Sequence, residues 1–397
     1  MKLATRTTRI VPSPTLNIAA TAKAMVKQGI DVADFSIGEP SCDTPAFVKA
    51  AAQAAIQAGF TKYTPVPGID ELREAIIEKF HRDQGIRYEK AQILVSCGAK
   101  HTLYNLAQAL FESGDEVIIP VPYWVSYPDQ VRLADATPVF LQTDESKGYA
   151  IEPAALEACL SPHTKALILN SPCNPTGTVY NRQTLEDIAR VALRHHFLII
   201  SDEIYEKMHY DGMEHLSIVS VAPEVAPQTI LVNGVSKAFA MTGWRIGYAA
   251  GPKELITAMN HIQSQSTSNP TSISQKAALA ALTGGTSFFA ELMGDLEPKR
   301  NLMVERLNKI PGIMCPTPIG AFYAFPNVAA LFGRRHPKGI ISTPSDLATY
   351  LLNEANIACV PGEPFGSPAH LRFSYTPTLE TIHRGMDRME TAIQALA

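Results

Sequence analysis

Short apolar segments that alternate with helical segments are the feature that most constrains the fold of this chain. Between about residues 46 and 284, each apolar segment has the length of a short buried strand. Strands that alternate with helices are typical of a mostly parallel sheet covered by helices on both faces. We therefore expect a seven-stranded α/β sheet with strands at Ile93–Ser96, Glu116–Ile119, Pro138–Leu141, Ala166–Leu169, Leu198–Ser201, Thr229–Asn233 and Ile246–Ala249.

The rest of the chain predicts a second, smaller domain, because 397 residues exceed the usual size of one hydrophobic core. A helix over about 252–283 and a second long helix through Leu307 would lead into this α+β domain. Strands near Phe322–Phe325 and His370–Ser374 would belong to it. The predicted organisation is an N-terminal arm over 1–15, a large domain over 46–284, and a small domain formed by 16–45 and 285–397.

Charge, hydropathy and cysteine usage exclude several classes of protein. The net charge of −4 offers no general basic surface for nucleic acid. No apolar run approaches the ~20 residues of a membrane span, and the N-terminal segment lacks the apolar core of a secretory signal. Six scattered cysteines favour reduced thiols and a cytoplasmic location. No metal site is predicted, because the adjacent His195 and His196 have a poor geometry for sharing one metal and no His-Glu-x-x-His motif occurs; both histidines are expected at a helix end.

One segment, Gly234 to Gly247, combines two side chains with distinct chemistry. Lys237 follows Ser236, and Arg245 comes eight positions after the lysine. A lysine amine condenses with aldehydes when burial or nearby cations lower its pKa, and the planar guanidinium group binds phosphate. Pyridoxal phosphate carries both an aldehyde and a phosphate, so it would suit this pair. Alternatively, both residues belong to a solvated face.

Two polar residues follow apolar strands upstream of this segment. Asp202 ends the strand that begins near Phe197, with Tyr205 three residues further on. A carboxylate at the carboxyl end of such a strand lies where ligands bind, and it could keep a pyridine nitrogen protonated. Asn174, in the turn after another strand, would be a neutral hydrogen-bond donor. A strand-end cap and a turn-forming residue are the alternatives for these two positions.

A third segment predicts an anion site. The strand Ile93–Ser96 runs into a tight turn at Gly98 and then into a helix that begins near Ala99. Backbone N–H groups at a helix N-terminus bind anions, and small residues allow a phosphate to approach them. An ordinary strand–helix turn is the alternative. The chain contains neither a Gly-x-Gly-x-x-Gly motif nor a P-loop motif, which argues against dinucleotide and nucleotide binding.

With these motifs in order, the chain resembles the class I aminotransferases of fold type I, in particular the aspartate aminotransferase branch. Beside the lysine segment, the resemblance rests on Ser36–Pro40, Tyr63–Gly68, Asn174–Gly177, Ser201–Tyr205 and Leu371–Tyr375. It implies a large domain that binds pyridoxal 5'-phosphate, a small mobile domain, and a homodimer with shared active sites. It also implies ping-pong transamination between amino acids and 2-oxo acids.

Matched position by position, the resemblance implies a role for each site residue. Lys237 would hold the cofactor and carry protons, Asp202 would face the ring nitrogen, and Tyr205 would face the ring oxygen; these three would be catalytic. The other implied cofactor contacts are Gly98, Ala99, Lys100, Trp124, Asn174, Ser236, Arg245 and, from the neighbouring chain, Tyr63. The implied substrate contacts are Gly38 and Arg372 at the α-carboxylate, together with Trp124, Asn174, Lys100 and Thr15.

Substrate preference rests on fewer residues. Lys100 and Thr15 are the candidates for the second carboxylate of aspartate and glutamate, although Lys100 could also be a solvated helix residue. Their combination resembles enzymes that also accept prephenate, whereas Val11 stands where one related subgroup has a basic residue. We expect L-aspartate and 2-oxoglutarate as substrates, with prephenate to arogenate as a further reaction. The alternatives are an aromatic or broad-specificity aminotransferase, a carbon–sulfur lyase of the same fold type, or a cofactor-binding module without turnover.

Overall fold

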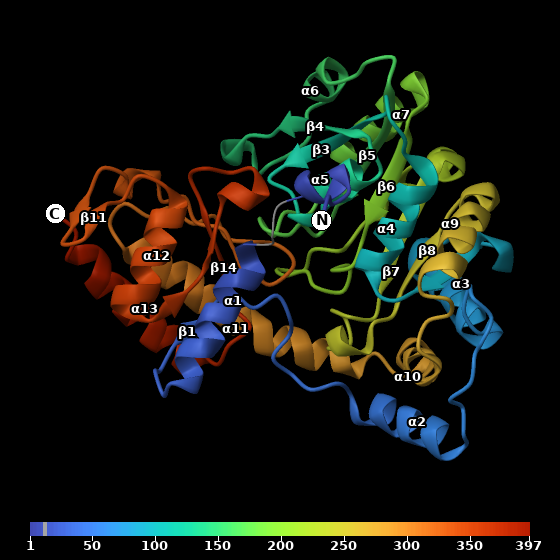
Figure 1. The fold of residues 1–397 in the computed structure, drawn as a ribbon, viewed down its shortest axis with the longest axis horizontal. Coiled ribbons are helices and arrows are strands. Elements are labelled where there is room, and N and C mark those ends of the chain that lie inside the picture. Colours follow the sequence, from blue (N-terminus) through green and yellow to red (C-terminus); the bar gives the residue numbers. More distant parts are fainter. Residues whose placement is uncertain (11–13) are drawn as a thin grey trace.

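A central seven-stranded sheet organises the computed structural model, which describes residues 1–10 and 14–397 but no side chains at 14–17 and 19 (Figure 1). The strand order is β2-β8-β7-β6-β5-β3-β4, and only β8 runs antiparallel to its neighbours. All seven predicted strands are confirmed to within two residues at either end. They are β2 (Ile93–Ser96), β3 (Glu116–Val121), β4 (Thr137–Gln142), β5 (Thr164–Asn170), β6 (Leu198–Asp202), β7 (Thr229–Gly234) and β8 (Gly247–Ala250).

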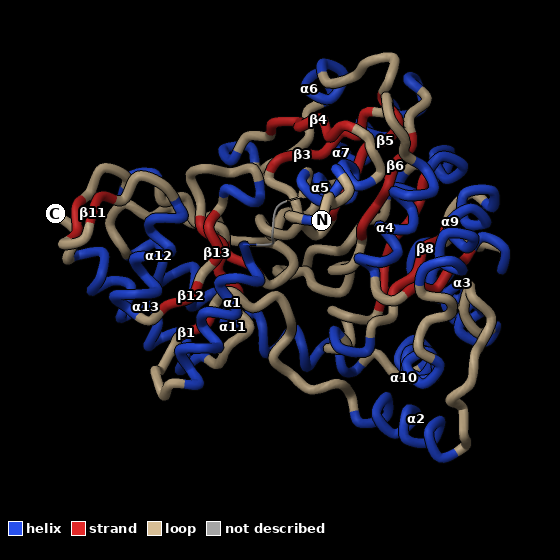
Figure 2. Tube along the Cα trace, in the orientation of Figure 1, coloured by secondary structure: helices blue, strands red, loops and turns tan. Residues whose placement is uncertain are grey.

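Helices cover both faces of this sheet, and the strands alternate their apolar side chains between them. In β2, Ile93 and Val95 join the core beneath one helical layer, while Leu94 joins the core beneath the other. Figure 2 shows this sheet between the two sets of helices. The helices are α1 (Pro14–Lys27), α2 (Ala46–Gln57), α3 (Asp70–Gln84), α4 (Ala99–Leu110), α5 (Ser126–Leu133), α6 (Pro153–Ala158), α7 (Arg182–His195), α8 (Ile218–Val221), α9 (Lys253–Ser266), α10 (Ser272–Thr283), α11 (Ser287–Lys309), α12 (Pro344–Ala355) and α13 (Leu379–Gln394).

Helix α7 shows how the sequence specifies one of these elements. The side chain of Asn181 accepts a hydrogen bond from the backbone N–H of Thr184 at 2.9 Å and so caps the first turn. Leu185, Ile188 and Ala192 then recur at helical spacing and are buried. The helix ends at His195 because His196 takes a left-handed conformation with φ 59°. The expectation that both histidines lie at a helix end is confirmed.

The single helix predicted over about 252–283 is wrong, because the structure has two helices there. Helix α9 ends at Ser266 and helix α10 begins at Ser272. Ser268 adopts a left-handed conformation with φ 60°. Pro270 lacks a backbone N–H and restricts the residue before it to extended conformations. The apolar pattern continues across this break, so the pattern alone did not reveal it.

A second set of elements packs beside the sheet and includes segments from both ends of the sequence. Strand β1 (Ala33–Asp34) pairs in parallel with β12 (Ile357–Ala358), and the backbone N–H of Ser374 donates to the carbonyl of Phe35 at 2.8 Å. In Figure 1, helix α1 lies beside the C-terminal elements. The remaining strands are β9 (Tyr323–Ala324), β10 (Arg335–His336), β11 (Gly339–Ile340), β13 (Val360–Pro361) and β14 (Leu371–Ser374).

This arrangement agrees with the strands predicted near 322–325 and 370–374, since β9 and β14 pair antiparallel. The domain boundaries at 15, 45 and 284 stay predictions.

All six cysteines are free thiols. Within the part of the chain that the structure describes, no helix combines the length and apolar character needed to cross a bilayer.

Candidate active site

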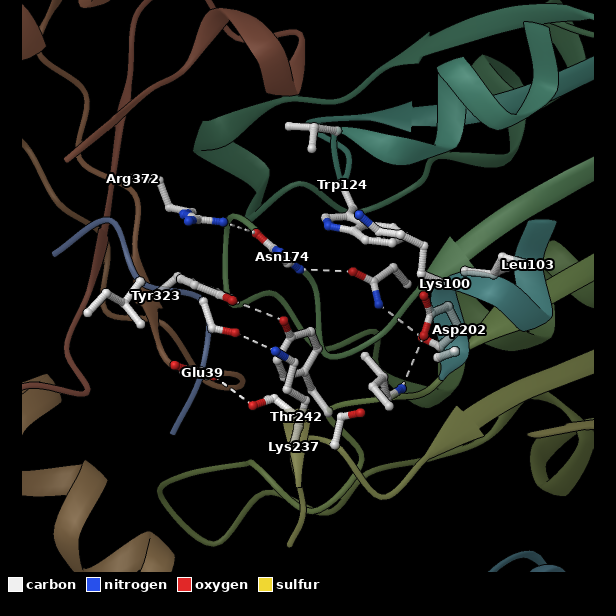
Figure 3. A pocket seen from close by; sticks show the side chains of 18 of the residues that line it. Glu39, Lys100, Leu103, Trp124, Asn174, Asp202, Lys237, Thr242, Tyr323 and Arg372 are labelled. Carbon is white, nitrogen blue, oxygen red and sulfur yellow. Dashed lines mark hydrogen bonds between the residues drawn. The ribbon is translucent and has the colours of Figure 1, made fainter. Parts of the chain in front are cut away.

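A cavity of about 440 Å³ lies at the carboxyl edge of the parallel strands, between the central sheet and the elements around β9 and β14. In Figure 3, Arg372 and Asp202 lie on opposite sides of it, with Lys237 between them. The predicted site residues that line this cavity are Gly38, Ala99, Lys100, Trp124, Asn174, Asp202, Tyr205, Ser236, Lys237, Arg245 and Arg372. The structure therefore brings together residues that are up to 334 positions apart in the sequence (372 − 38).

Lys237 follows β7 and extends into the centre of the cavity. Its Nζ donates a hydrogen bond to the carbonyl oxygen of Gly38, and it lies 5.8 Å from the ring centroid of Tyr205. Burial lowers the pKa of Lys237 to about 8; Glu39 raises this pKa, and the positive charge of Arg372 lowers it. A substantial fraction of this amine is thus neutral near physiological pH, which a lysine nucleophile requires.

Asp202 is the last residue of β6 and is buried. Its Oδ2 accepts a hydrogen bond from the hydroxyl of Tyr127 at 2.7 Å, and its Oδ1 accepts one from the backbone N–H of Ile204 at 3.2 Å. Burial raises the pKa of Asp202 to about 6, although both hydrogen bonds oppose this shift. A cationic N–H placed against this carboxylate would replace the solvation that burial removes.

The predicted anion site lies where α4 begins. Gly98 has φ 91°, and a Cβ there would lie 2.2 Å from Nη2 of Arg245, so the guanidinium group packs directly on the glycine backbone. Among the described residues, Arg245 donates only to neutral acceptors, the carbonyl oxygens of Thr242 at 2.9 Å and Cys97 at 3.3 Å. An unneutralised guanidinium group beside a helix N-terminus and the Ser236 hydroxyl has the chemistry that could hold a phosphate.

Arg372, on β14, forms a second cationic site and is only 4% exposed. It donates to Oδ1 of Asn174 at 3.1 Å and to the carbonyl of Ser36 at 3.0 Å, and both acceptors are neutral. Its Nε is buried without a hydrogen-bond partner among the described residues. Burial lowers the pKa of Arg372. A carboxylate in the cavity would neutralise this guanidinium group, and the amide nitrogen of Asn174 stays available to donate elsewhere.

Lys100 and Trp124 lie together on one wall of the cavity. The Nζ of Lys100 is 4.9 Å from the ring centroid of Trp124, within cation–π range. Burial, followed by the charge of Arg245, lowers the pKa of Lys100. The Trp124 ring packs edge-on against Tyr127 with centroids 5.2 Å apart. Lys100 therefore faces the cavity rather than only the solvent side of α4.

Four residues named in the sequence analysis are not placed in this cavity. Tyr63 is 90% exposed in a turn outside it, so the chain alone does not test the predicted contact with a neighbouring chain. Thr15 belongs to α1, but its side chain lies outside the described residues, and Val11 lies outside them altogether. Gly98 does not line the cavity itself but supports Arg245.

The structure also adds residues that the sequence did not reveal. Tyr127 and Tyr323 line the cavity with buried hydroxyls, and Lys23 of α1 reaches its wall. The hydroxyl of Thr242 donates to the carboxylate of Glu39 at 2.6 Å and so joins the lysine loop to the Gly38 segment. Tyr127 could have been suspected from its position three residues after Trp124. The others depend on contacts between distant segments.

A separate cluster of possible metal ligands lies behind this site. Ligand atoms of Glu203, Glu206 and His215 are within 4.8 Å of one another. However, the ammonium group of Lys79 is 2.5 Å from Oε2 of Glu206. The carboxylate of Glu203 already accepts hydrogen bonds from Ser201, Ser217 and Gln84. These contacts are those of a buried charge network rather than of a vacant metal site.

Comparisons with known proteins agree with this geometry. A family model described as "Aminotransferase class I and II" matches residues 30–389. An aspartate aminotransferase of Geobacillus stearothermophilus is 46% identical over 400 residues, covering all of both chains. A probable aspartate/prephenate aminotransferase of Rickettsia bellii is 45% identical and covers 99% of each chain. The crystal structure of an aspartate aminotransferase from Rhizobium meliloti superimposes with a TM-score of 0.96 at 43% identity, covering all of both chains.

The lowered pKa of Lys237 predicts its reactivity toward aldehydes. With a pKa of about 8, half of the Lys237 amine is neutral at that pH. An ordinary lysine amine is half neutral only at about pH 10.4. After treatment with hydroxylamine to remove bound carbonyl compounds, a short pulse of formaldehyde and borohydride should label Lys237 with a midpoint near pH 8. Peptide mass mapping measures this against a reference lysine peptide. Labelling that rises only near pH 10 would contradict the assignment.

Proposed function

Because the chain belongs to the class I and II aminotransferases, we propose that it transfers the amino group of L-aspartate to 2-oxoglutarate with pyridoxal 5'-phosphate as its cofactor. One observation carries this proposal. Three cations, Lys237, Arg245 and Arg372, converge on one cavity with only neutral hydrogen-bond partners among the described residues. An amine and two unneutralised guanidinium groups fit an aldehyde, a phosphate and a carboxylate, respectively.

The residues present fit the cofactor. Lys237 would hold it covalently, the start of α4 with Ser236 and Arg245 would bind its phosphate, and Asp202 would face its ring nitrogen. When bound, pyridoxal phosphate supplies an aldehyde for amines and a ring that accepts the electron pair left when an α-proton departs. Trp124 would pack on the face of that ring. The hydroxyl of Tyr205 and the amide of Asn174 would donate to its ring oxygen.

The chain's own residues would orient the substrate and move its proton. Arg372 would bind the α-carboxylate through its guanidinium group, which Asn174 and Ser36 already hold in place. The pKa of Lys237 is about 8, so part of its amine is neutral. This amine would accept the proton of the substrate's α-carbon and deliver it to the cofactor carbon that carries the aldehyde, C4′. The amino acid and the 2-oxo acid would use this site in turn, which is a ping-pong scheme.

Prephenate is a second candidate acceptor, because relatives named aspartate/prephenate aminotransferase match nearly the whole chain. Lys100, at the cavity wall, could bind the distal carboxylate of either acid. We also propose that the domains divide at residues 15, 45 and 284, that the chain forms a homodimer, and that it is located in the cytoplasm.

A matrix of amino donors and 2-oxo acids tests the reaction. L-Aspartate with 2-oxoglutarate should give oxaloacetate and L-glutamate at the highest kcat/KM, and prephenate should serve as an additional acceptor. Faster turnover of phenylalanine than of aspartate would instead indicate an aromatic aminotransferase. Release of ammonia and pyruvate from a thioether amino acid would indicate a carbon–sulfur lyase. Absence of any turnover with bound cofactor would indicate a binding module.

The role of Lys100 predicts a selective loss. Lys100→Ala should lower kcat/KM for aspartate and glutamate by about tenfold, the effect of losing one charge-assisted contact at a partly solvated position. Phenylalanine, which lacks the second carboxylate, should be affected by less than about twofold. Arg372→Ala is the matched control, since it should impair all three amino acids alike. An unchanged ratio of aspartate to phenylalanine efficiency in Lys100→Ala would exclude Lys100 as the distal-carboxylate contact.

The role of Tyr63 predicts complementation between chains. If its exposed side chain completes the phosphate site of a partner in a two-fold dimer, Tyr63→Ala should weaken cofactor binding, and Lys237→Ala should abolish turnover. Hybrid dimers of the two variants then contain one site with an intact Lys237 and an intact Tyr63 from the other chain. Mixing the variants under exchange conditions should restore activity. Failure to complement, or a fully active monomer in sedimentation, would show that Tyr63 does not act across an interface.

A further inference from the structure

Tyr323 contacts both a residue assigned to the cofactor, Tyr205, and the residue assigned to the substrate's α-carboxylate, Arg372. It lies on β9 and is 1% exposed. Its hydroxyl is 3.0 Å from the hydroxyl of Tyr205, the residue assigned to the cofactor's ring oxygen. Its ring lies against the guanidinium group of Arg372, with Cζ 4.4 Å from the ring centroid. One residue therefore lies between the groups assigned to the cofactor and to the α-carboxylate.

The two hydroxyls can form only one ordered arrangement when Tyr205 serves the cofactor. Each phenol carries a single proton. If Tyr205 donates its proton to the ring oxygen, the short contact with Tyr323 requires Tyr323 to be the donor. Burial raises the pKa of both phenols, so both protons are retained. A hydrogen bond received by Tyr205 polarises its O–H group and strengthens the bond that it donates.

The contact between Tyr205 and Tyr323 is held by the two sheets from which these residues come. Tyr205 follows β6 in the central sheet, whereas Tyr323 belongs to the three-stranded sheet of β13, β14 and β9. Next to the pair, the hydroxyl of Tyr210 donates to the carbonyl of Ala321 at 2.7 Å, and the N–H of Ala321 donates to Met208 at 3.0 Å. The contact thus joins the two parts of the fold beside the cavity.

We propose that Tyr323 is a positioning residue with two separable roles. Its hydroxyl orients and polarises Tyr205, and its ring fixes the guanidinium group of Arg372 for the α-carboxylate. The hydroxyl role rests on the proposed function, because it needs the cofactor's ring oxygen. The ring role needs only a carboxylate ligand.

Two substitutions separate these roles. Tyr323→Phe removes the hydroxyl and keeps the ring, whereas Tyr323→Leu removes both. Tyr375→Phe is the matched control, because it deletes another buried phenol hydroxyl of the same sheet region, which donates to Ala321 at 3.2 Å and lies outside the cavity lining. Thermal unfolding of all three variants shows whether each one is folded.

The first measurement is a pH titration of the visible absorbance of the holoenzyme, in which Lys237 is linked to the cofactor. When the linkage loses its proton, the ring oxygen keeps its full negative charge, which donation from Tyr205 stabilises. Tyr323→Phe should therefore raise the apparent pKa of the linkage by about 0.2 to 0.3 units, because it weakens, but does not remove, the bond from Tyr205 to the ring oxygen. Tyr375→Phe should leave this pKa unchanged.

The second measurement is the affinity for maleate, an unreactive dicarboxylate, by calorimetry. Tyr323→Leu should weaken binding by about tenfold, since a cation–π contact with a desolvated guanidinium group is lost. Tyr323→Phe and Tyr375→Phe should bind maleate like the unsubstituted protein.

An unshifted titration in Tyr323→Phe, or an equal shift in Tyr375→Phe, would overturn the hydroxyl role. Unchanged maleate affinity in folded Tyr323→Leu would overturn the ring role. If the unsubstituted protein forms no lysine-linked chromophore with pyridoxal phosphate, the proposed function fails and the hydroxyl role falls with it. The maleate measurement still decides the ring role in that case.

Discussion

The parallel alignment of the central strands is the constraint on which the rest of the site depends. Because β5, β6 and β7 run in one direction, their carboxyl ends meet at one edge of the sheet. Asp202 ends β6, and Lys237 follows the end of β7. Strand β2 has the same direction as β7, since both pair antiparallel with β8, so Gly98 and the start of α4 reach that edge too. One topology thus collects an acid, an amine and the N-terminus of a helix.

Burial at this edge of the sheet shifts the pKa values of the side chains that meet there. It lowers the pKa of Lys237 and Arg372 and raises that of Asp202, because burial disfavours the charged form of each group. Burying a guanidinium group such as Arg372 with only neutral hydrogen-bond partners costs folding free energy. Such groups are expected where a ligand completes the electrostatics, which is why they mark the site more clearly than the cavity shape does.

The sequence predicted the parts of the fold that depend on local pattern. Apolar runs bounded by turn residues predicted the central strands, and polar residues after strands predicted Asp202 and Asn174, because strand direction fixes where such ends meet. Lys237 was predicted from its chemistry and its spacing to Arg245. The break at Pro270 was missed, since the apolar pattern continues on both sides of it. Tyr323 could not be identified, because its role arises from contacts with Tyr205 and Arg372, which are distant in sequence. The contact of Tyr63 with a neighbouring chain stays a prediction.

The environment of Asp202 also determines where a proton shared with a ring nitrogen would lie. Burial alone would protonate the carboxylate and leave the nitrogen neutral, which would weaken the ring as an electron acceptor. Tyr127 at 2.7 Å and the N–H of Ile204 at 3.2 Å both donate to Asp202, and each stabilises its ionised form. Both oxygens already have a partner, and a ring N–H would be a third donor to the ionised carboxylate, so the shared proton would be more stable on nitrogen. Tyr127 therefore favours the charge distribution that the proposed transamination requires.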